Sequence, residues 1–412
     1  MNGFCQRVTL FLLALLPLWA MAQQTRSLSE RIRTVQVIMN DNPLAPPVAR
    51  MGSSVEIGFD ELTHEYTRYI YKVEFCHADW TPVTELFESD WLEGFNGRPI
   101  EDAETSFNTT VLYTHYRIVL PNEDLQLKLP GNYRVRVYEE DSETPVLEAC
   151  FALYVPEMNV LAQVSSNTDI DFNKTHQQVT YALNYGSRRV VNPQQELKTV
   201  VMQNRRWDTA VINLAPNMQT TAGAEWTHRR ELIFDAGAEF HKFEILDVRL
   251  NGMNVDRMEW FEPYYHATLF AAQPQHNYTS DTDADGTYII RHSGDEDNDT
   301  QSEYLIVHFL LQTPRLPGGD VYVCGTWDSG FPDPRCRMHY DEQRHAYECG
   351  VLLKQGYYSY QFRQLDADGI GRTARTEGDF YQTENEYIIL VYHRPQGARY
   401  DALVGVRVVQ SS

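Results

Sequence analysis

The segment Asn132-Tyr-Arg-Val-Arg-Val-Tyr138 alternates large apolar residues with arginines. Successive side chains of a β-strand point to opposite faces, so Tyr133, Val135 and Val137 are expected on one buried face. Similar runs rich in Val, Ile, Tyr, Phe and Thr recur along the chain, separated by Asn, Asp, Gly and Pro. The clearest of them are 54–59, 69–75, 244–250, 304–310 and 387–392. This regular spacing predicts an all-β protein built from β-sandwiches.

The N-terminus is typical of a secretory signal peptide. Arg7 supplies a positive charge, residues 8–19 are apolar at all positions but one, and Ala20-Met-Ala22 fits the small-x-small cleavage pattern. The apolar run is too short and wrongly flanked for a stable membrane span. We therefore expect residues 1–22 to be removed and the exported chain to begin near Gln23, with no integral membrane span.

The chain is strongly acidic. Its formal charge is −22, and removal of residues 1–22, which contain one Arg and no acidic residue, takes this to −23. Nucleic-acid binding depends on neutralising phosphates with Lys and Arg, so nucleic acid is not expected as a partner. Anionic lipid surfaces are disfavoured for the same reason. The sequence also gives no reason to expect a small-molecule ligand.

Two boundaries divide the predicted mature chain. The first is near Pro156, where the apolar run 149–155 ends. The second is a polar segment between Pro274 and Asp299, rich in Asp, Asn, Ser and Gly. We predict three domains of ordinary size, at 30–156, 157–272 and 285–410.

Five cysteines follow the predicted signal peptide, namely Cys76, Cys150, Cys324, Cys336 and Cys349. An odd number leaves at least one thiol unpaired. Cys336 and Cys349 flank a predicted hairpin, where a cross-strand disulfide would contribute ~3 kcal/mol through loop closure. Cys76 and Cys150 fall in one predicted domain and form a second candidate pair. None of the five has the spacing of a metal site.

One acidic segment matches the opening of a calcium-binding loop. Asp281, Asp283 and Asp285 occupy its first, third and fifth positions, and Gly286 the sixth. The twelfth position should be a bidentate Glu, but here it is His292, which has no oxygen ligand. The three aspartates are therefore a weak candidate for calcium, and an acidic solvated turn is the alternative.

No arrangement in the sequence predicts catalysis. Cys76 and His77 could be a nucleophile and its base, but adjacent residues of a strand point to opposite faces. Residues 369–374 fit the dinucleotide pattern G-x-G-x-x-A, but without the parallel strand and helix that it requires. No H-E-x-x-H, P-loop or G-x-S-x-G motif occurs. We predict a non-enzymatic protein with no catalytic residues and no cofactor.

Several short strings occur in a specific order over the three predicted domains. They are Gly58-Phe-Asp-Glu-Leu62, Cys76-His-Ala-Asp-Trp80, Leu92-Glu-Gly-Phe95, Gln203-Asn-Arg205, Phe234-Asp-Ala-Gly237, Leu353-Lys-Gln-Gly-Tyr-Tyr-Ser-Tyr360, Glu377-Gly-Asp-Phe-Tyr-Gln-Thr-Glu-Asn-Glu-Tyr387 and Gly397-Ala-Arg-Tyr-Asp-Ala-Leu-Val-Gly405. Together they resemble the type IX secretion system plug proteins of Bacteroidota. The family favours Asn and Arg where this chain has Ala238 and His241. The polar contacts that this Asn and Arg make in relatives are therefore not expected here.

This resemblance implies the protein's location, partner and role. It implies a periplasmic protein that is peripherally associated with the outer membrane. There it would dock on the periplasmic mouth of the large outer-membrane β-barrel of the type IX translocon and seal the pore while no cargo moves. Loops of β-sandwiches carry binding more often than strands do. We therefore select Trp91, Phe95 and Asn96, and a second group formed by Tyr381, Thr383 and Glu384, as candidate docking residues.

The third predicted domain has a second resemblance. Residues 321–327 and 356–362 are similar to early-set sandwiches that bind α-glucans, in which exposed aromatic rings stack on sugars. The fold expected for the whole chain is thus three tandem immunoglobulin-like or early-set β-sandwich domains after a signal peptide. The alternative function is a periplasmic glycan-binding protein, which requires Trp327 and at least one further ring on the same exposed face. A shared fold does not fix function, so both functions stay open at this point.

Overall fold

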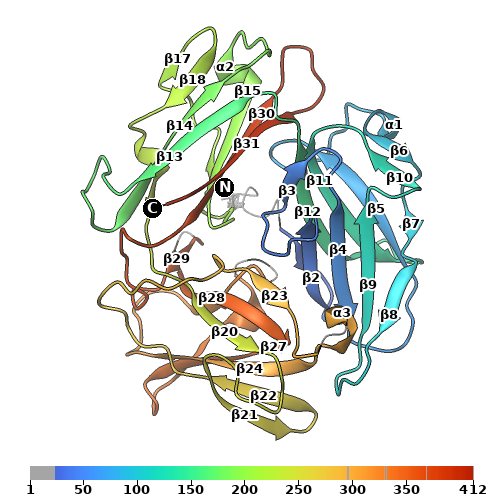
Figure 1. The fold of residues 1–412 in the computed structure, drawn as a ribbon, viewed down its shortest axis with the longest axis vertical. Helices are drawn as coiled ribbons and strands as arrows, with labels where there is room; N and C mark the ends of the chain where they lie inside the picture. The colour runs from blue at the N-terminus through green and yellow to red at the C-terminus, as the bar shows by residue number, and fades with distance from the viewer. Residues whose placement is uncertain (1–23, 295–296, 329, 331, 368, 412) are drawn as a thin grey trace, which may run out of the picture.

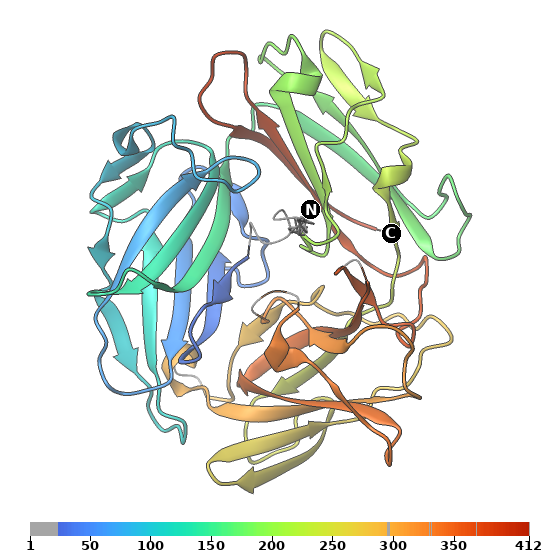
Figure 2. The same ribbon diagram turned by 180° about the vertical axis from the view of Figure 1, so that it is seen from behind.

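The computed structural model describes residues 24–294, 297–328, 330, 332–367 and 369–411. The predicted signal peptide lies outside these residues. The described chain is mostly β-structure in several antiparallel sheets, and its helices have only three or four residues each. No helix among the described residues is long and apolar enough to cross a membrane. Three groups of sheets are arranged around a common centre (Figures 1 and 2).

The first unit, residues 26–154, has two main sheets around one apolar core. One sheet has the order β1 (Arg26–Ser27), β12 (Pro145–Tyr154), β11 (Gly131–Glu139), β5 (Tyr69–Cys76) and β7 (Arg98–Pro99), and β3 (Val48–Arg50) pairs in parallel with β12. The other has the order β2 (Ile32–Met39), β4 (Val55–Glu61), β9 (Thr114–Leu120) and β8 (Asp102–Thr105). A short ribbon of β6 (Leu92–Gly94) and β10 (Leu125–Leu127) follows α1 (Glu88–Trp91).

The alternating segment 132–138 lies in β11, at the centre of its sheet. Tyr133, Val135 and Val137 are fully buried in the core of the first unit, which confirms the predicted face. Arg134 and Arg136 lie on the opposite face and pair with Glu74 of β5. The predicted strand pattern is therefore correct at this site, although the arginine face is also largely covered.

The second unit joins residues 159–235 to the C-terminal residues 386–410. One sheet has the order β13 (Asn159–Ser165), β14 (His176–Asn184), β18 (Gly223–Trp226) and β17 (Met218–Gln219), and β19 (Ile233–Asp235) also pairs with β14. The other has the order β16 (Val211–Ile212), β15 (Leu197–Gln203), β30 (Glu386–His393) and β31 (Ala402–Gln410). The short helices α2 (Pro193–Glu196) and η2 (Arg230–Leu232) connect strands of this unit.

The third unit spans residues 241–373. One sheet is built around β28 (Gly356–Leu365), which pairs with β20 (His241–Ile245), β23 (Tyr288–Ile290), β25 (Val321–Cys324) and β29 (Gly371–Thr373). The other has the order β21 (Val255–Phe261), β22 (Tyr264–Leu269), β24 (Tyr304–Gln312), β27 (Ala346–Lys354) and β26 (His339–Asp341), in which β22 and β24 are parallel. The short helices are α3 (Asn298–Gln301) and η3 (Pro334–Cys336).

The C-terminal strand β30 is buried on both faces. Tyr387, Ile389 and Val391 contribute to the core of the second unit. Ile388 contributes instead to a smaller apolar cluster that includes Ala152 of the first unit. A strand covered on both faces reads as a continuous apolar run without alternation, which is the pattern of this segment. The dark red strands in Figures 1 and 2 run between the green second unit and the blue first unit.

The strand pairings correct two of the predicted domain limits. β20, β21 and β22, which the prediction 157–272 placed in the middle domain, pair with strands of the third unit. β30 and β31, which the prediction 285–410 placed in the last domain, complete the second unit. Pairing between segments nearly 200 residues apart is determined by tertiary packing, so local composition does not show it. The first predicted boundary, near Pro156, follows the end of β12.

The other predicted strands agree with the structure except at one place. The run 244–250 is a strand only as far as Ile245. Asp247 then accepts hydrogen bonds from the backbone N–H and the guanidinium of Arg249, which makes a turn instead of a longer strand.

Candidate docking surface

Two strongly exposed aromatic rings flank α1 and β6 in the first unit. Phe87 is 75% exposed and immediately precedes α1, whereas Phe95 is 77% exposed and immediately follows β6. The side chain of Asn96 donates a hydrogen bond of 3.1 Å to Glu88, which brings the two segments together. Large apolar rings at such exposure are the kind of residue that anchors protein interfaces. We call Phe87 and Phe95 the aromatic pair.

Two of the selected docking residues have a structural role instead. Trp91 is only 6% exposed and stacks on Phe75 in the core, with the ring centroids 5.9 Å apart. Asn96 bonds the backbone N–H and the backbone C=O of Val73, at 2.8 Å each. The prediction was therefore wrong for Trp91, because an aromatic side chain beside a loop often completes the core. Asn96 holds the loop on β5, and Phe95 alone of the three presents its side chain fully to solvent.

The second predicted docking group lies on the segment that returns from the third unit to the second. Thr383 is buried and donates its hydroxyl to the carbonyl of Gly237 at 2.8 Å, so its selection as a docking residue was wrong. Tyr381 is half-buried, and its backbone N–H bonds the carbonyl of Lys174 at 3.0 Å. Glu384 is exposed. This segment therefore mainly connects the third unit to the second, and of the three selected residues Glu384 is the one exposed to solvent.

A buried ionic cluster joins the first and third units. Lys354 at the end of β27 contacts Asp60 of β4 at 2.7 Å, and Tyr304 donates its hydroxyl to the same carboxylate at 2.6 Å. His115 contacts the other carboxylate oxygen at 2.7 Å. Burial alone would raise the pKa of Asp60, but Lys354 and His115 hold it below its usual value. The carboxylate is thus ionised, and its charge is balanced across the boundary between the two units.

Sequence reasoning did not identify this cluster as important. Asp60 and Lys354 each lie in a string that carries the family resemblance, but they are 294 positions apart. Each of the two is a charged residue near the end of an apolar strand, which is visible in the sequence. The sequence does not show that Asp60 and Lys354 pair with each other.

The first and second units are also joined by buried contacts. Tyr392 of β30 donates its hydroxyl to Asn132 of β11 at 2.9 Å, with both residues buried. Asp401 contacts Lys198 at 2.9 Å and accepts a hydrogen bond from the backbone N–H of Ala78 at 3.1 Å. Together with the apolar cluster around Ala152, these bonds connect the C-terminal segment to both units.

Comparison with known proteins identifies the family. The family model described as the type 9 secretion system plug protein 1st domain matches residues 32–155. A crystal structure of a hypothetical protein from Parabacteroides merdae ATCC 43184 is 40% identical with a TM-score of 0.91, and the match covers 94% of this chain and 99% of that chain. The chain belongs to the type IX secretion system plug protein family.

Two further comparisons do not bear on the family of this chain. The C-terminal domain of the Streptococcus pyogenes antigen I/II-family protein AspA is 7% identical with a TM-score of 0.19, which is too low for an argument. No curated protein matches the sequence significantly.

The calcium candidate is a structured turn. Asp281 contacts the ammonium of Lys242 at 2.6 Å. Asp283 accepts hydrogen bonds from the backbone N–H groups of Phe240 and Asp285, at 2.6 and 2.7 Å. Among the described residues, no group of three or more His, Cys, Asp or Glu side chains is arranged to hold a metal ion. The carboxylate oxygens of Asp281 and Asp283 are thus engaged within the turn.

The aromatic residues required for glycan binding are packed inward. Trp327 stacks on Phe309 at 5.9 Å and donates its indole N–H to the carbonyl of Ser359 at 3.2 Å. Tyr358 and Tyr360 are 2% and 5% exposed. Stacking on a sugar needs an open ring face, so these residues do not form a sugar-binding platform.

The predicted disulfides are absent from the structure. All five cysteines among the described residues are free and buried. Cys76 on β5 and Cys150 on β12 lie on either side of β11, so two strand spacings separate their backbones, beyond the reach of a disulfide. Cys336 lies in η3, before β26, and Cys349 of β27 follows the last residue paired with β26, Glu348. The predicted hairpin exists, but its register does not place Cys336 opposite Cys349.

Cys76 and His77 do not form a catalytic pair. The ring of His77 contacts Glu85 at 3.2 Å and Asp401 at 3.3 Å. Burial raises the pKa of the Cys76 thiol to about 12, so the thiol is protonated at neutral pH. Cys76 therefore has a packing role, and His77 contributes to the contact between the first and second units.

Proposed function

We propose that this protein is a non-enzymatic periplasmic plug that binds the periplasmic mouth of the type IX outer-membrane translocon and seals its pore. Membership of the plug family carries the proposal. The expected signal peptide and the acidic, exported character of the chain support a periplasmic location. A pore that passes folded cargo breaches the outer-membrane barrier, so it needs a closure on one side.

The joined architecture supports a plug that acts as one body. The Asp60–Lys354 pair connects the first and third units, and the Asn132–Tyr392 bond connects the first and second. Binding a preformed surface costs less ordering entropy than binding a flexible one. We propose that the three two-sheet units are immunoglobulin-like sandwiches, in agreement with their antiparallel sheets around single cores.

We propose the aromatic pair as the anchor of the docking surface, with the translocon barrel as its occupant. Phe87 and Phe95 are exposed rings on two segments that Asn96 links to Glu88 and to the backbone of Val73. A backbone that is already held in place loses little entropy on binding, which favours these rings as anchors. The acidic surface of the chain would set the docking orientation by charge complementarity.

Affinity purification tests the partner. The full-length chain carries a tag on a flexible linker after its last residue and is captured from gently solubilised envelopes of its own organism. We expect one very large outer-membrane barrel to co-purify with the wild-type chain and with a Phe172→Asp control, which changes another exposed ring in the second unit. The Phe87→Asp/Phe95→Asp variant should recover much less of the barrel. Absence of a barrel, together with binding of the purified chain to α-glucans, would contradict the proposal and favour the glycan-binding alternative.

A further inference from the structure

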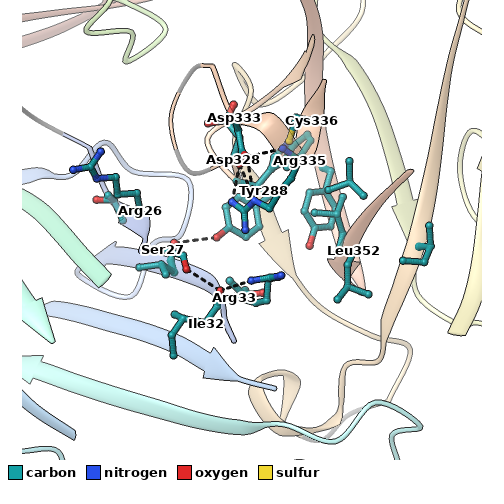
Figure 3. A pocket seen from close by; sticks show the side chains of 18 of the residues that line it. Arg26, Ser27, Ile32, Arg33, Tyr288, Asp328, Asp333, Arg335, Cys336 and Leu352 are labelled. Carbon is teal, nitrogen blue, oxygen red and sulfur yellow. Dashed lines mark hydrogen bonds and ion pairs between the residues drawn. The ribbon is translucent and has the colours of Figure 1, made fainter. Parts of the chain in front are cut away.

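A cavity of about 380 Å³ lies between the first and third units (Figure 3). The first unit contributes the N-terminal strand β1 and one end of β2, and the third unit contributes β23, β27 and the segment around η3. Much of the lining is apolar and includes Ile32, Ile306, Val351 and Leu352. None of these residues belongs to the docking surface or to the Asp60–Lys354 cluster.

A β-bulge sets the position of Arg33 at this cavity. The register between β2 and β4 shifts between Arg33 and Gln36, so the intervening residues have no partners on β4. Thr34 has a φ of 49°, which is unusual for a β-branched residue, and its hydroxyl bonds that of Tyr304 at 2.5 Å. Bulges of this kind re-aim side chains next to binding sites. The backbone is thus strained at Thr34, immediately after Arg33, which lines the cavity.

The guanidinium of Arg33 has no acidic partner. It donates a hydrogen bond of 2.9 Å to the backbone carbonyl of Ile32, and no ion pair involves it among the described residues. Burial and the neighbouring Arg335 lower the pKa of Arg33, and the weaker opposing effects of Tyr304, Glu30 and Asp333 do not reverse this. Arg335 itself is neutralised by Asp333, with a contact of 2.6 Å. The cavity therefore contains a guanidinium that forms no ion pair among the described residues, although the whole chain is strongly acidic.

A purely structural role does not account for this arrangement. A half-buried cation without a counter-ion costs stability, and exposed solvation would avoid that cost. The folded chain has many carboxylates, yet the two that line the cavity are engaged elsewhere. Asp333 binds Arg335, and Asp328 accepts hydrogen bonds from the backbone N–H groups of Gly330 and Gly325, at 2.7 and 3.4 Å. A local conflict of this kind is expected at a binding site.

We propose that this cavity binds a ligand that carries a carboxylate next to a small branched apolar group. The carboxylate pairs with the guanidinium of Arg33, whose fork geometry matches two carboxylate oxygens. The apolar group contacts Ile306 and Val351 on the opposite wall. Two sources share this chemistry, namely the C-terminus of a polypeptide and a free short-chain organic acid. The sequence alone gave no reason to expect such a ligand.

Calorimetric titration of the purified mature chain tests the proposal with two matched pairs of probes. One pair is acetyl-valyl-leucine and its C-terminal amide, and the other is 4-methylpentanoate and 4-methylpentanamide. Each acid should bind the wild-type chain about 10- to 100-fold more tightly than its amide, the range of a charge-assisted hydrogen bond. Arg33→Met should remove this preference. Arg407→Met, which removes an exposed charge on β31, should keep it.

Each outcome bears on the cavity site. Tighter binding of the dipeptide than of the short acid identifies a polypeptide terminus as the ligand, whereas equal binding identifies a free organic acid. The proposal fails if neither acid binds at millimolar concentration, if acid and amide bind equally, or if Arg33→Met binds the acid as tightly as the wild-type chain does. Arg33 has no ion-pair partner among the described residues, so Arg33→Met should unfold at the same temperature or higher. The comparison of acid with amide on the wild-type chain does not depend on any variant.

Discussion

Lys354 of the third unit and Asp60 of the first unit form an ion pair of 2.7 Å in which the two side chains are 1% and 0% exposed. The same ammonium donates a hydrogen bond of 2.6 Å to the carbonyl of Asp299 and lies 4.2 Å from the ring centroid of Tyr113. Both charges are therefore removed from water, and each has several partners. Such a pair specifies how two units meet, because any other arrangement leaves a buried charge unbalanced.

Asp60→Asn should destabilise the protein by about 3–5 kcal/mol, because it leaves the ammonium of Lys354 buried without a counter-ion. Urea unfolding followed by tryptophan fluorescence measures the change. The double variant Asp60→Asn/Lys354→Met should recover much of the loss, since the unbalanced charge is gone. Asp141→Asn, at an exposed position of the first unit, should change stability by less than about 0.5 kcal/mol. A loss of under about 1 kcal/mol for Asp60→Asn would show that the pair does not hold the units together.

The same pair gives a pH dependence of known sign. The pKa of Asp60 is lower in the folded chain than its usual value, because the charges of Lys354 and His115 outweigh the effect of burial. The stabilisation is therefore present above the usual carboxyl pKa and is lost as the pH falls through the lower folded value. In Asp60→Asn this loss on acidification should be absent.

Asp285→Asn should stabilise the protein at pH 8 and leave it unchanged at pH 4. Burial, together with the charges of Asp283 and Glu386, raises the pKa of Asp285 to about 7. The folded chain then holds a proton that the unfolded chain releases, so this group lowers stability progressively as the pH rises from about 4 to about 7. The full shift would correspond to ~4 kcal/mol, and solvent screening at this partly exposed position reduces the expected gain to about 1–2 kcal/mol.

Thermal unfolding as a function of pH measures this effect. Asn tolerates the φ of 49° at position 285, so the change adds no backbone strain. Asp256→Asn, at an exposed position of the third unit, is the control and should show the pH profile of the wild-type chain. A parallel profile for Asp285→Asn would contradict the raised pKa.

Thiol titration checks the cysteine assignment. The denatured mature chain should react at five thiols without prior reduction, because Cys76, Cys150, Cys324, Cys336 and Cys349 are all free. The native chain should react slowly, since burial raises the pKa of Cys150 and of Cys349 to about 11. Denatured protein treated with reductant is the control and should give the same count. A count that rises by two or four after reduction would restore the predicted disulfides.

The sequence predicted the β-class and most strands because a strand leaves a local pattern. Tyr133 and Val135 alternate with arginines, and the structure places them in the core. Pairing partners leave no such pattern. β30 was identified as a strand, yet its pairing with β15 nearly 200 residues earlier could not be read from either segment. The predicted limits of the second and third domains were wrong for this reason.

The candidate docking site was predicted in part. Phe95 is exposed, so its docking role stays a prediction, whereas Trp91 and Thr383, which were also selected, are buried. Loop position alone does not determine exposure, because aromatic rings and hydroxyls beside loops often complete a core or a hydrogen-bond network. Phe87 was not among the selected residues, and the hydrogen bond between Asn96 and Glu88 links the segments that carry Phe87 and Phe95.

The Phe87→Asp/Phe95→Asp variant should weaken translocon binding without loss of stability. Both rings are more than 70% exposed, so the change in unfolding free energy should stay within about 0.5 kcal/mol. Loss of aromatic anchors typically costs about 2 kcal/mol or more each in an interface. Pull-down against the solubilised barrel measures binding, and Phe172→Asp is the matched control. Equal recovery of the barrel by both variants would move the docking surface elsewhere on the chain.

Outer-membrane permeability measures whether the chain seals the translocon pore. The measurement is uptake of a large antibiotic that the intact outer membrane excludes, in the parent strain, in a strain without this chain, and in that strain with the chain restored. We expect increased uptake when the chain is absent, a return to the parental level with the wild-type chain, and little return with the Phe87→Asp/Phe95→Asp variant. If the strain that lacks the chain excludes the antibiotic as well as the parent does, the chain does not seal the translocon pore.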